Sequence, residues 1–121
     1  MPYASRLNRQ TPIVGSTSQI NLGQGVTVTV VQSDAQGVMM QDGQTPVTGD
    51  HTGETNPPSE NDYSITLKVS YGSLDYVTGG DTDGDYDTSG YGYTYNDVES
   101  VIAPRIGQVE ILRVKGCFVE F

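Results

Sequence analysis

The stretch from Gly79 to Asp97, GGDTDGDYDTSGYGYTYND, concentrates the residue types best able to bind a cation. It places aspartate at every second position, at Asp81, Asp83, Asp85 and Asp87, and contains no Lys or Arg. Calcium prefers carboxylate and other oxygen ligands, so this spacing is compatible with an irregular calcium site. A solvated acidic loop explains the same composition without any ligand. Both interpretations stay open at this point.

An EF-hand does not explain these aspartates. That calcium loop needs glycine at its sixth position and glutamate at its twelfth. Counted from Asp81, those positions hold Tyr86 and Gly92, and the register that starts two residues later fails at both positions as well. Any calcium site in this stretch would therefore be of another kind.

The remaining residues with ligand or nucleophile chemistry occur singly. His51 is the only histidine, lies beside Asp50 in a polar loop, and is predicted to be exposed. It is a further candidate metal ligand, but zinc sites generally need three or four ligands. Cys117 is the only cysteine, which excludes an intrachain disulfide, and we predict a small packed residue there. The sequence contains no Ser/His/Asp set, phosphate-binding loop or CxxC motif.

The composition limits the class of protein. The chain has 121 residues, 35% of them hydrophobic, with 15 glycines, which predicts one domain with a thin core and many turns. Its net charge of −9 argues against nonspecific binding to nucleic acid or to anionic membranes, and is compatible with divalent cations. No apolar run reaches the roughly 18 residues of a membrane span.

The compartment is not determined by the sequence. The start MPYASRLNRQ has no apolar h-region, so it is not a signal peptide as written. An acidic surface selected for solubility favours an extracellular or bacterial-envelope location. We therefore treat a secreted protein as an expectation and leave the compartment open.

Hydrophobic periodicity predicts a β-rich fold. Residues 1–10 are interpreted as an arm and residues 11–121 as one domain. The alternation of valine and threonine predicts a strand at Val26–Gln32, with shorter strands at Gln19–Leu22 and Val38–Met40. Residues 41–62 are almost without apolar side chains and are expected to form a surface loop or a locally disordered insertion.

The segment YSITLKVSYGSLDYVT predicts a β-hairpin. The apolar residues Ile65, Leu67, Val69 and Tyr71 alternate with the polar residues Ser64, Thr66, Lys68 and Ser70. Gly72-Ser73 has the composition of a two-residue type II′ turn, and Leu74–Thr78 is the returning strand.

A short helix and a last strand are predicted after the acidic loop at residues 79–96. Asn96 is the expected N-cap and Glu99 completes a capping-box pattern, while Pro104 should end the helix near Ala103. The segment Gln108–Val114 is nearly continuous in apolar residues and predicts a strand buried on both faces. Strand, helix and strand in this order form a right-handed βαβ unit, so the fold class is α/β with a hairpin-rich sheet.

The segment ENDYSITLKVSYGSLDYVTGGD resembles metallo-β-lactamase-fold hydrolases, in particular the competence-protein (DNA-uptake channel) type and its secreted bacterial cousins. In that family a strand-end aspartate bridges two divalent ions, and the matching position is Asp81 in TGGD. YNDVESVIAPRIGQVEILRV is similar to the family's helix and buried strand, and TPIVGSTSQINLGQGVTVTVV to an earlier strand pair. The resemblance covers residues 11–114 and implies a partial αββα fold.

The chain departs from the family in its metal ligands. It has no His-x-His-x-Asp-His motif, and VKGCFVEF stands where the family continues with His-His-Gly-Ser. The resemblance therefore implies the C-terminal half of a zinc hydrolase, as a natural truncation, a frameshift or a designed fragment. One carboxylate cannot assemble a binuclear zinc site, so we expect the chain alone to be inactive.

A second hypothesis is a non-catalytic, acidic, β-rich module that self-assembles or binds calcium. Half of an αββα fold would expose an apolar sheet face and an unpaired edge. We therefore expect either a homo-oligomer or association with a complementing chain.

Overall fold

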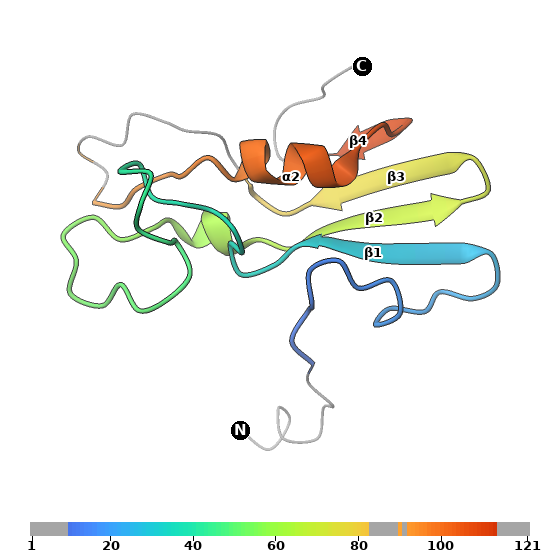
Figure 1. The fold of residues 1–121 in the computed structure, drawn as a ribbon, viewed down its shortest axis with the longest axis horizontal. Coiled ribbons are helices and arrows are strands. Elements are labelled where there is room, and N and C mark those ends of the chain that lie inside the picture. The colour runs from blue at the N-terminus through green and yellow to red at the C-terminus, as the bar shows by residue number, and fades with distance from the viewer. Residues whose placement is uncertain (1–9, 83–89, 91, 114–121) are drawn as a thin grey trace.

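The computed structural model of the protein describes residues 10–82, 90 and 92–113. Within these residues it is a small, β-rich α+β fold, in which a mixed four-stranded sheet packs against one α-helix (Figure 1). The elements are β1 (Val26–Gln32), a 3-10 turn η1 (Glu60–Tyr63), β2 (Thr66–Tyr71), β3 (Leu74–Gly79), α2 (Val98–Ile106) and β4 (Ile111–Arg113).

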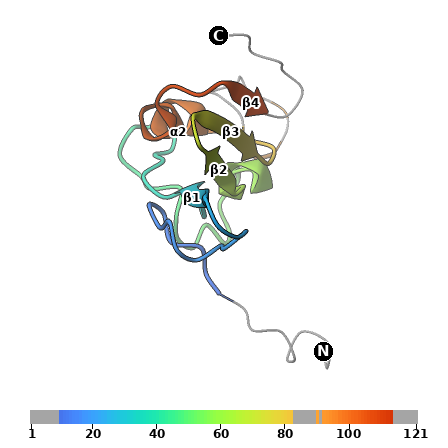
Figure 2. The same cartoon turned by 90° about the vertical axis from the view of Figure 1, so that its right-hand side faces the viewer.

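The strands lie in the sheet in their sequence order. Figure 2 shows this order from β1 at the bottom to β4 at the top. The pairs β1–β2 and β2–β3 are antiparallel, whereas β4 is parallel to β3 and is reached through α2. The predicted βαβ unit is thus confirmed. Because β1, β3 and β4 run in one direction, their last residues share one edge of the sheet, which we call the carboxyl edge.

The predicted hairpin is confirmed. Tyr71 pairs with Leu74 across the two-residue turn Gly72-Ser73, and the pairing continues to Thr66 opposite Gly79. Gly72 has a φ of 58°, which the primed turns of tight hairpins require at their first position and which glycine adopts without steric cost.

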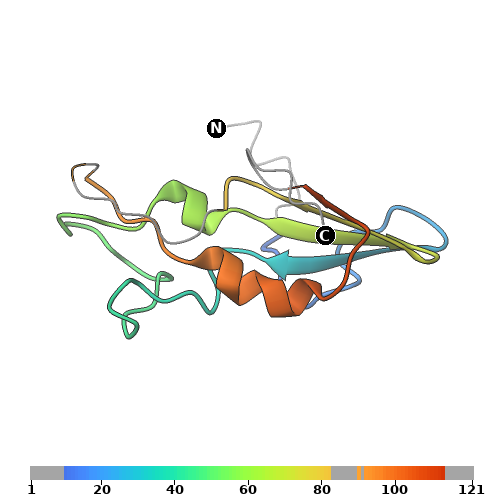
Figure 3. The same cartoon turned by 90° about the horizontal axis from the view of Figure 1, so that it is seen from above.

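The core lies between α2 and one face of the sheet, which we call the helix face (Figure 3). Val77 of β3 is fully buried on that face, and Leu112 of β4 packs against the same core. The helix contributes Val98, Ile102 and Ile106 at a spacing of four residues, as a helix with one buried side requires. Val31, Ala35, Val38 and Val47 complete the buried cluster.

Two short predicted strands are wrong. Gln19–Leu22 is a bend, and of Val38–Met40 only Met39 makes an isolated bridge, to Pro46. The edge of β1 that faces away from β2 is hydrogen-bonded instead to a turn that precedes it in the chain. The Val30 C=O accepts from Gly15 N–H, and the Val30 N–H donates to Ser16 O. Once Val30 is bonded there, residues 19–22 have no strand beside them to pair with.

The last strand was predicted to be buried on both faces, and this is also wrong. Within the described residues β4 spans Ile111–Arg113 and is paired on one side, with β3. Its side chain on the helix face, Leu112, is half-buried, whereas Ile111 on the other face is 47% exposed. A run of apolar residues does not tell an edge strand from a central one.

The helix begins and ends later than predicted. Its N-cap is Asp97, whose side chain accepts from Ser100 N–H, rather than Asn96. It continues past Pro104 to Ile106 because tertiary contacts hold its last turn. The Arg105 guanidinium donates to Val31 O, Gln32 Oε1 and Gln36 O, and Lys68 Nζ donates to Ile106 O. No helix in the described ranges is both long and apolar enough to cross a membrane.

Candidate functional site at the carboxyl edge

Asp81 lies two residues beyond β3, at the carboxyl edge, and is exposed to solvent. Its backbone is tied to the start of β2: Asp81 N–H donates to Ser64 Oγ at 3.1 Å, and Gly80 N–H donates to Ile65 O at 3.2 Å. The carboxylate is thus carried on a segment whose main chain is held by two hydrogen bonds.

The two glycines before Asp81 provide space rather than an unusual turn. Neither Gly79 nor Gly80 has a positive φ. A Cβ on Gly80 would lie 2.8 Å from both Cβ and Oγ of Ser64, and one on Gly79 would lie 3.1 Å from Thr66 Oγ1. Glycine is required because the two strands approach closely at this end of the hairpin.

A buried polar pair lies behind the same edge. Asp62, in η1, is 0% exposed, and Asn96, just before α2, is 1% exposed. Asn96 Nδ2 donates to Asp62 Oδ2 at 2.8 Å, and the Asn96 backbone N–H donates to Oδ1 at 3.3 Å. Hydrogen bonds to a charged acceptor are stronger than neutral ones. This pair therefore joins the 41–62 loop to the segment that leads into α2.

Within the part of the chain that the structure describes, three buried side-chain oxygen atoms near these residues have no hydrogen-bond partner. They are Thr66 Oγ1, Thr82 Oγ1 and Asn96 Oδ1. The two threonine hydroxyls both lie beside Gly79, at 3.1 and 3.5 Å from the position of a Cβ there. Buried polar atoms normally have a partner, and ordered water is the usual one when the protein provides none. We therefore expect a bound water beside Gly79.

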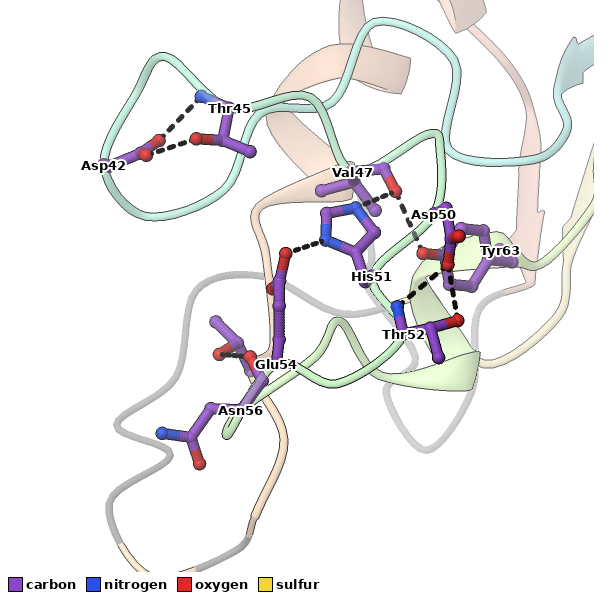
Figure 4. A network of polar contacts seen from close by, with 10 residues as sticks. Asp42, Thr45, Val47, Asp50, His51, Thr52, Glu54, Asn56 and Tyr63 are labelled. Atoms are coloured by element: carbon purple, nitrogen blue, oxygen red, sulfur yellow. Dashed lines mark hydrogen bonds and ion pairs between the residues drawn. The ribbon is translucent and has the colours of Figure 1, made fainter.

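The 41–62 loop is ordered by its own polar residues (Figure 4). Asp42 accepts from the backbone and side chain of Thr45, and Asp50 accepts likewise from Thr52. These bonds lower the pKa of both carboxyls, with the threonine hydroxyls as the largest cause. Val47 is fully buried in the core. The predicted surface loop is thus anchored at its centre by one apolar side chain.

His51 was predicted to be exposed, but only 9% of its side chain is. Its Nδ1 lies 2.9 Å from Glu54 Oε1 and its Nε2 lies 2.9 Å from Val47 O, which also accepts from the Tyr63 hydroxyl (Figure 4). A carboxylate and a carbonyl can only accept, so His51 makes both bonds as the doubly protonated imidazolium. A role as metal ligand would require it to give up one of them.

The ionisation of His51 is expected to control the pH dependence of folding. The hydrogen bond to Glu54 raises the pKa of His51 above its usual value, the bond to Val47 O adds to the rise, and burial opposes it. The stabilisation is therefore complete below the unfolded pKa of about 6.5 and is lost as pH rises through the higher folded pKa. Urea unfolding from about pH 5.5 to about 8.5 measures it.

The control for this prediction is His51→Gln, which removes the only histidine. Its unfolding free energy should be nearly constant over the same pH range, whereas that of the unchanged protein falls. Equal slopes for the two proteins would show that His51 does not carry the effect.

The aromatic residue beside this loop is also in an acidic environment. Burial raises the pKa of the Tyr63 hydroxyl, and the carboxylates of Asp62, Asp34, Glu60 and Glu54 raise it further. Negative charge thus collects at the carboxyl edge, which is an environment that favours cations.

The predicted ligands are not gathered into one metal site by the described residues. Asp83, Asp85, Asp87 and Cys117 lie outside the described residues. The bonds of His51 are to its own loop, and none of them is to Asp81. Within residues 10–82, 90 and 92–113, no three His, Cys, Asp or Glu side chains are grouped so as to hold a metal ion. The zinc and calcium hypotheses stay predictions.

The pairing of Asp62 with Asn96 was not predicted from the sequence. Asp62 has polar neighbours in the sequence and Asn96 was interpreted as a helix cap, so neither stood out. Ser59, three residues before Asp62, caps η1, and a serine at that position is the one local signal that could have indicated a turn there.

No protein-family model, curated protein or solved structure matches this chain. A function for the chain therefore has to come from its residues and their geometry.

Proposed function

We propose that the chain is the C-terminal part of a metal-dependent hydrolase of the metallo-β-lactamase fold, with Asp81 as its one metal ligand. The observation that supports this most is the position of Asp81. It follows the second strand of a hairpin, lies exposed at the carboxyl edge, and precedes a helix that leads into a strand parallel to β3. This is the order of elements that the resemblance implies.

The parallel pairing of β3 and β4 adds a geometric reason. Thr78 lies opposite Arg113, and Asp81 follows Thr78 by three residues. In the family the resemblance points to, the next ligand comes directly after this last strand, and the end of β4 belongs to the same edge of the sheet as Asp81.

The two-layer arrangement is compatible with half of an αββα fold. The sheet has α2 on its helix face, and exposed apolar side chains, Tyr71, Leu74 and Ile111, on the other. In an αββα fold that second face packs against another sheet. We propose this αββα arrangement for the intact protein.

The residues present do not complete a metal site. Among the described residues only Asp81 occupies a ligand position that the resemblance implies, and one carboxylate does not hold a metal pair. In the intact family the metals supply a hydroxide at neutral pH that attacks an ester or phosphodiester. We derive no reaction step for this chain and expect it to be inactive alone.

The DNA around the reading frame tests the proposal. We expect it to encode a His-x-His-x-Asp-His motif upstream and His-His-Gly-Ser in a shifted frame after Val114. The purified chain should show no zinc-dependent hydrolysis of a phosphodiester such as bis-p-nitrophenyl phosphate. The absence of both motifs, or zinc-dependent turnover by the chain alone that Asp81→Ala abolishes, would contradict it.

A further inference from the structure

We propose that the sheet face opposite α2, which we call the open face, pairs with the same face of a second copy of the chain. This inference rests on the surface of the described residues and does not depend on the proposed hydrolase ancestry.

The pairing register defines the open face. Val77 is in the core and pairs with Lys68, so both lie on the helix face. Side chains alternate along a strand, which places the neighbouring Tyr76 and Val69 on the open face. Ile111 pairs with Tyr76, so it lies there too.

The exposed large apolar side chains of β2, β3 and β4 all lie on this face. Tyr71 is 62% exposed, Leu74 46% and Ile111 47%. Leu67, Val69 and Tyr76 are half-buried between them. On β1 the face is already covered, because Val28 and Val30 are 1% exposed. The available surface therefore extends over three strands.

Among the described residues the open face carries no carboxylate, although the chain has 15 acidic residues. Asp75, in β3, and Glu110, just before β4, belong to the helix face: Asp75 lies 3.4 Å from Lys68 Nζ, and Glu110 accepts from Asp75 N–H. Arg113, at the far end of β4, is the only described charged residue on the open face. A flat, nearly uncharged face suits another apolar sheet face rather than a charged ligand.

A second copy of the chain carries the same face and is present at the same concentration. The two faces can pair in a self-complementary arrangement. At about 3.3 Å per residue β2 and β3 are about 20 Å long and β4 about 10 Å, so three strands about 4.8 Å apart present roughly 240 Å². A face-to-face pair then buries well below the approximately 1,200 Å² of stable complexes, so we expect a reversible dimer with a dissociation constant on the order of 100 µM.

Salt should strengthen this dimer. Each copy carries a net charge of −9, and the two copies repel one another at low ionic strength. The apolar contact itself is not weakened by salt. The sign of the salt effect distinguishes this association from one held by ion pairs, which salt weakens.

Sedimentation equilibrium tests the proposal with the unmodified chain. The average mass should rise from 13.0 kDa toward twice that value as the protein concentration approaches about 500 µM, and more steeply in about 0.5 M NaCl than in about 0.02 M. Ile111→Glu should weaken the association at least about tenfold. Thr27→Glu adds the same charge at an exposed position on the helix-face side of β1 and should change it by less than about threefold.

Circular dichroism should first confirm that both variants fold like the unmodified chain. A chain that stays at the monomer mass at the highest concentration and salt would overturn the proposal, and would leave the open face to a different partner. Equal weakening by Ile111→Glu and Thr27→Glu, or an association that salt weakens, would overturn it as well.

Discussion

Replacement of Asp62 with alanine is expected to lower the free energy of unfolding by about 3 kcal/mol. The Asp62 carboxylate is fully buried and accepts from the backbone N–H and from Nδ2 of Asn96, which is itself 1% exposed. Alanine leaves the backbone N–H of Asn96 without its acceptor. It also removes the shorter hydrogen bond of Asn96 Nδ2, the one to Asp62. A buried donor that loses a charged acceptor costs about 1.5 to 3 kcal/mol.

Chemical denaturation of Asp62→Ala and three further variants measures this effect. Glu60→Ala is the matched control, because Glu60 is an exposed carboxylate in the same 3-10 turn and should change the unfolding free energy by about 0.5 kcal/mol or less. The variant Asn96→Ala and the double variant with Asp62→Ala give the coupling between the two residues. If Asp62→Ala costs no more than Glu60→Ala, the buried pair does not stabilise the fold.

Replacement of Ile102 with alanine is expected to cost about 3 kcal/mol, within the range for large-to-small changes in a core. Ile102 is 3% exposed and is the central buried residue of α2, four positions from both Val98 and Ile106. Its removal opens a cavity between the helix and Val77. The chain has a thin core and few other side chains to close that gap.

A graded series separates the cavity from any effect on the helix itself. Ile102→Val should cost about 1 kcal/mol, and Glu99→Ala, on the exposed side of α2, about 0.5 kcal/mol or less. A loss at Ile102 that does not grow from valine to alanine would contradict a packed contact between α2 and the sheet.

The elements with a strong period and local turn signals could be predicted from the sequence. The strand Val26–Gln32 has the predicted bounds, and the hairpin around Gly72-Ser73 forms with the predicted alternation. In both cases the alternating side chains and the turn residues lie within a few positions of one another in the sequence. Local interactions are therefore sufficient to specify the element.

The burial of each face could not be predicted in the same way. The apolar side of the segment Ile65–Tyr71, which carries Ile65 and Tyr71, proved to be the more exposed one, whereas Thr66 on the polar side is fully buried. The reason is that α2 covers the face that carries Thr66 and Val77. Which face a helix covers depends on the crossover between β3 and β4 and not on the pattern of one strand.

The candidate site was predictable in part. The place of Asp81 at the end of β3 follows from the hairpin and its glycines. The pair Asp62–Asn96 joins residues 34 positions apart in the sequence, and no local pattern links them. The histidine loop was missed for a similar reason: the partners of His51 are a main-chain carbonyl and a carboxylate brought near by a turn.

The zinc content of a chain extended with the segments that the proposal predicts tests the central claim most directly. The proposal predicts His-x-His-x-Asp-His and His-His-Gly-Ser segments, these are added to the chain, and bound zinc is counted by mass spectrometry. We predict about two zinc ions per chain, and the loss of about one or more in Asp81→Asn. Glu110→Gln, at the opposite edge of the sheet, should keep both. Zinc content that is unchanged in Asp81→Asn would contradict the role of Asp81 as a metal ligand.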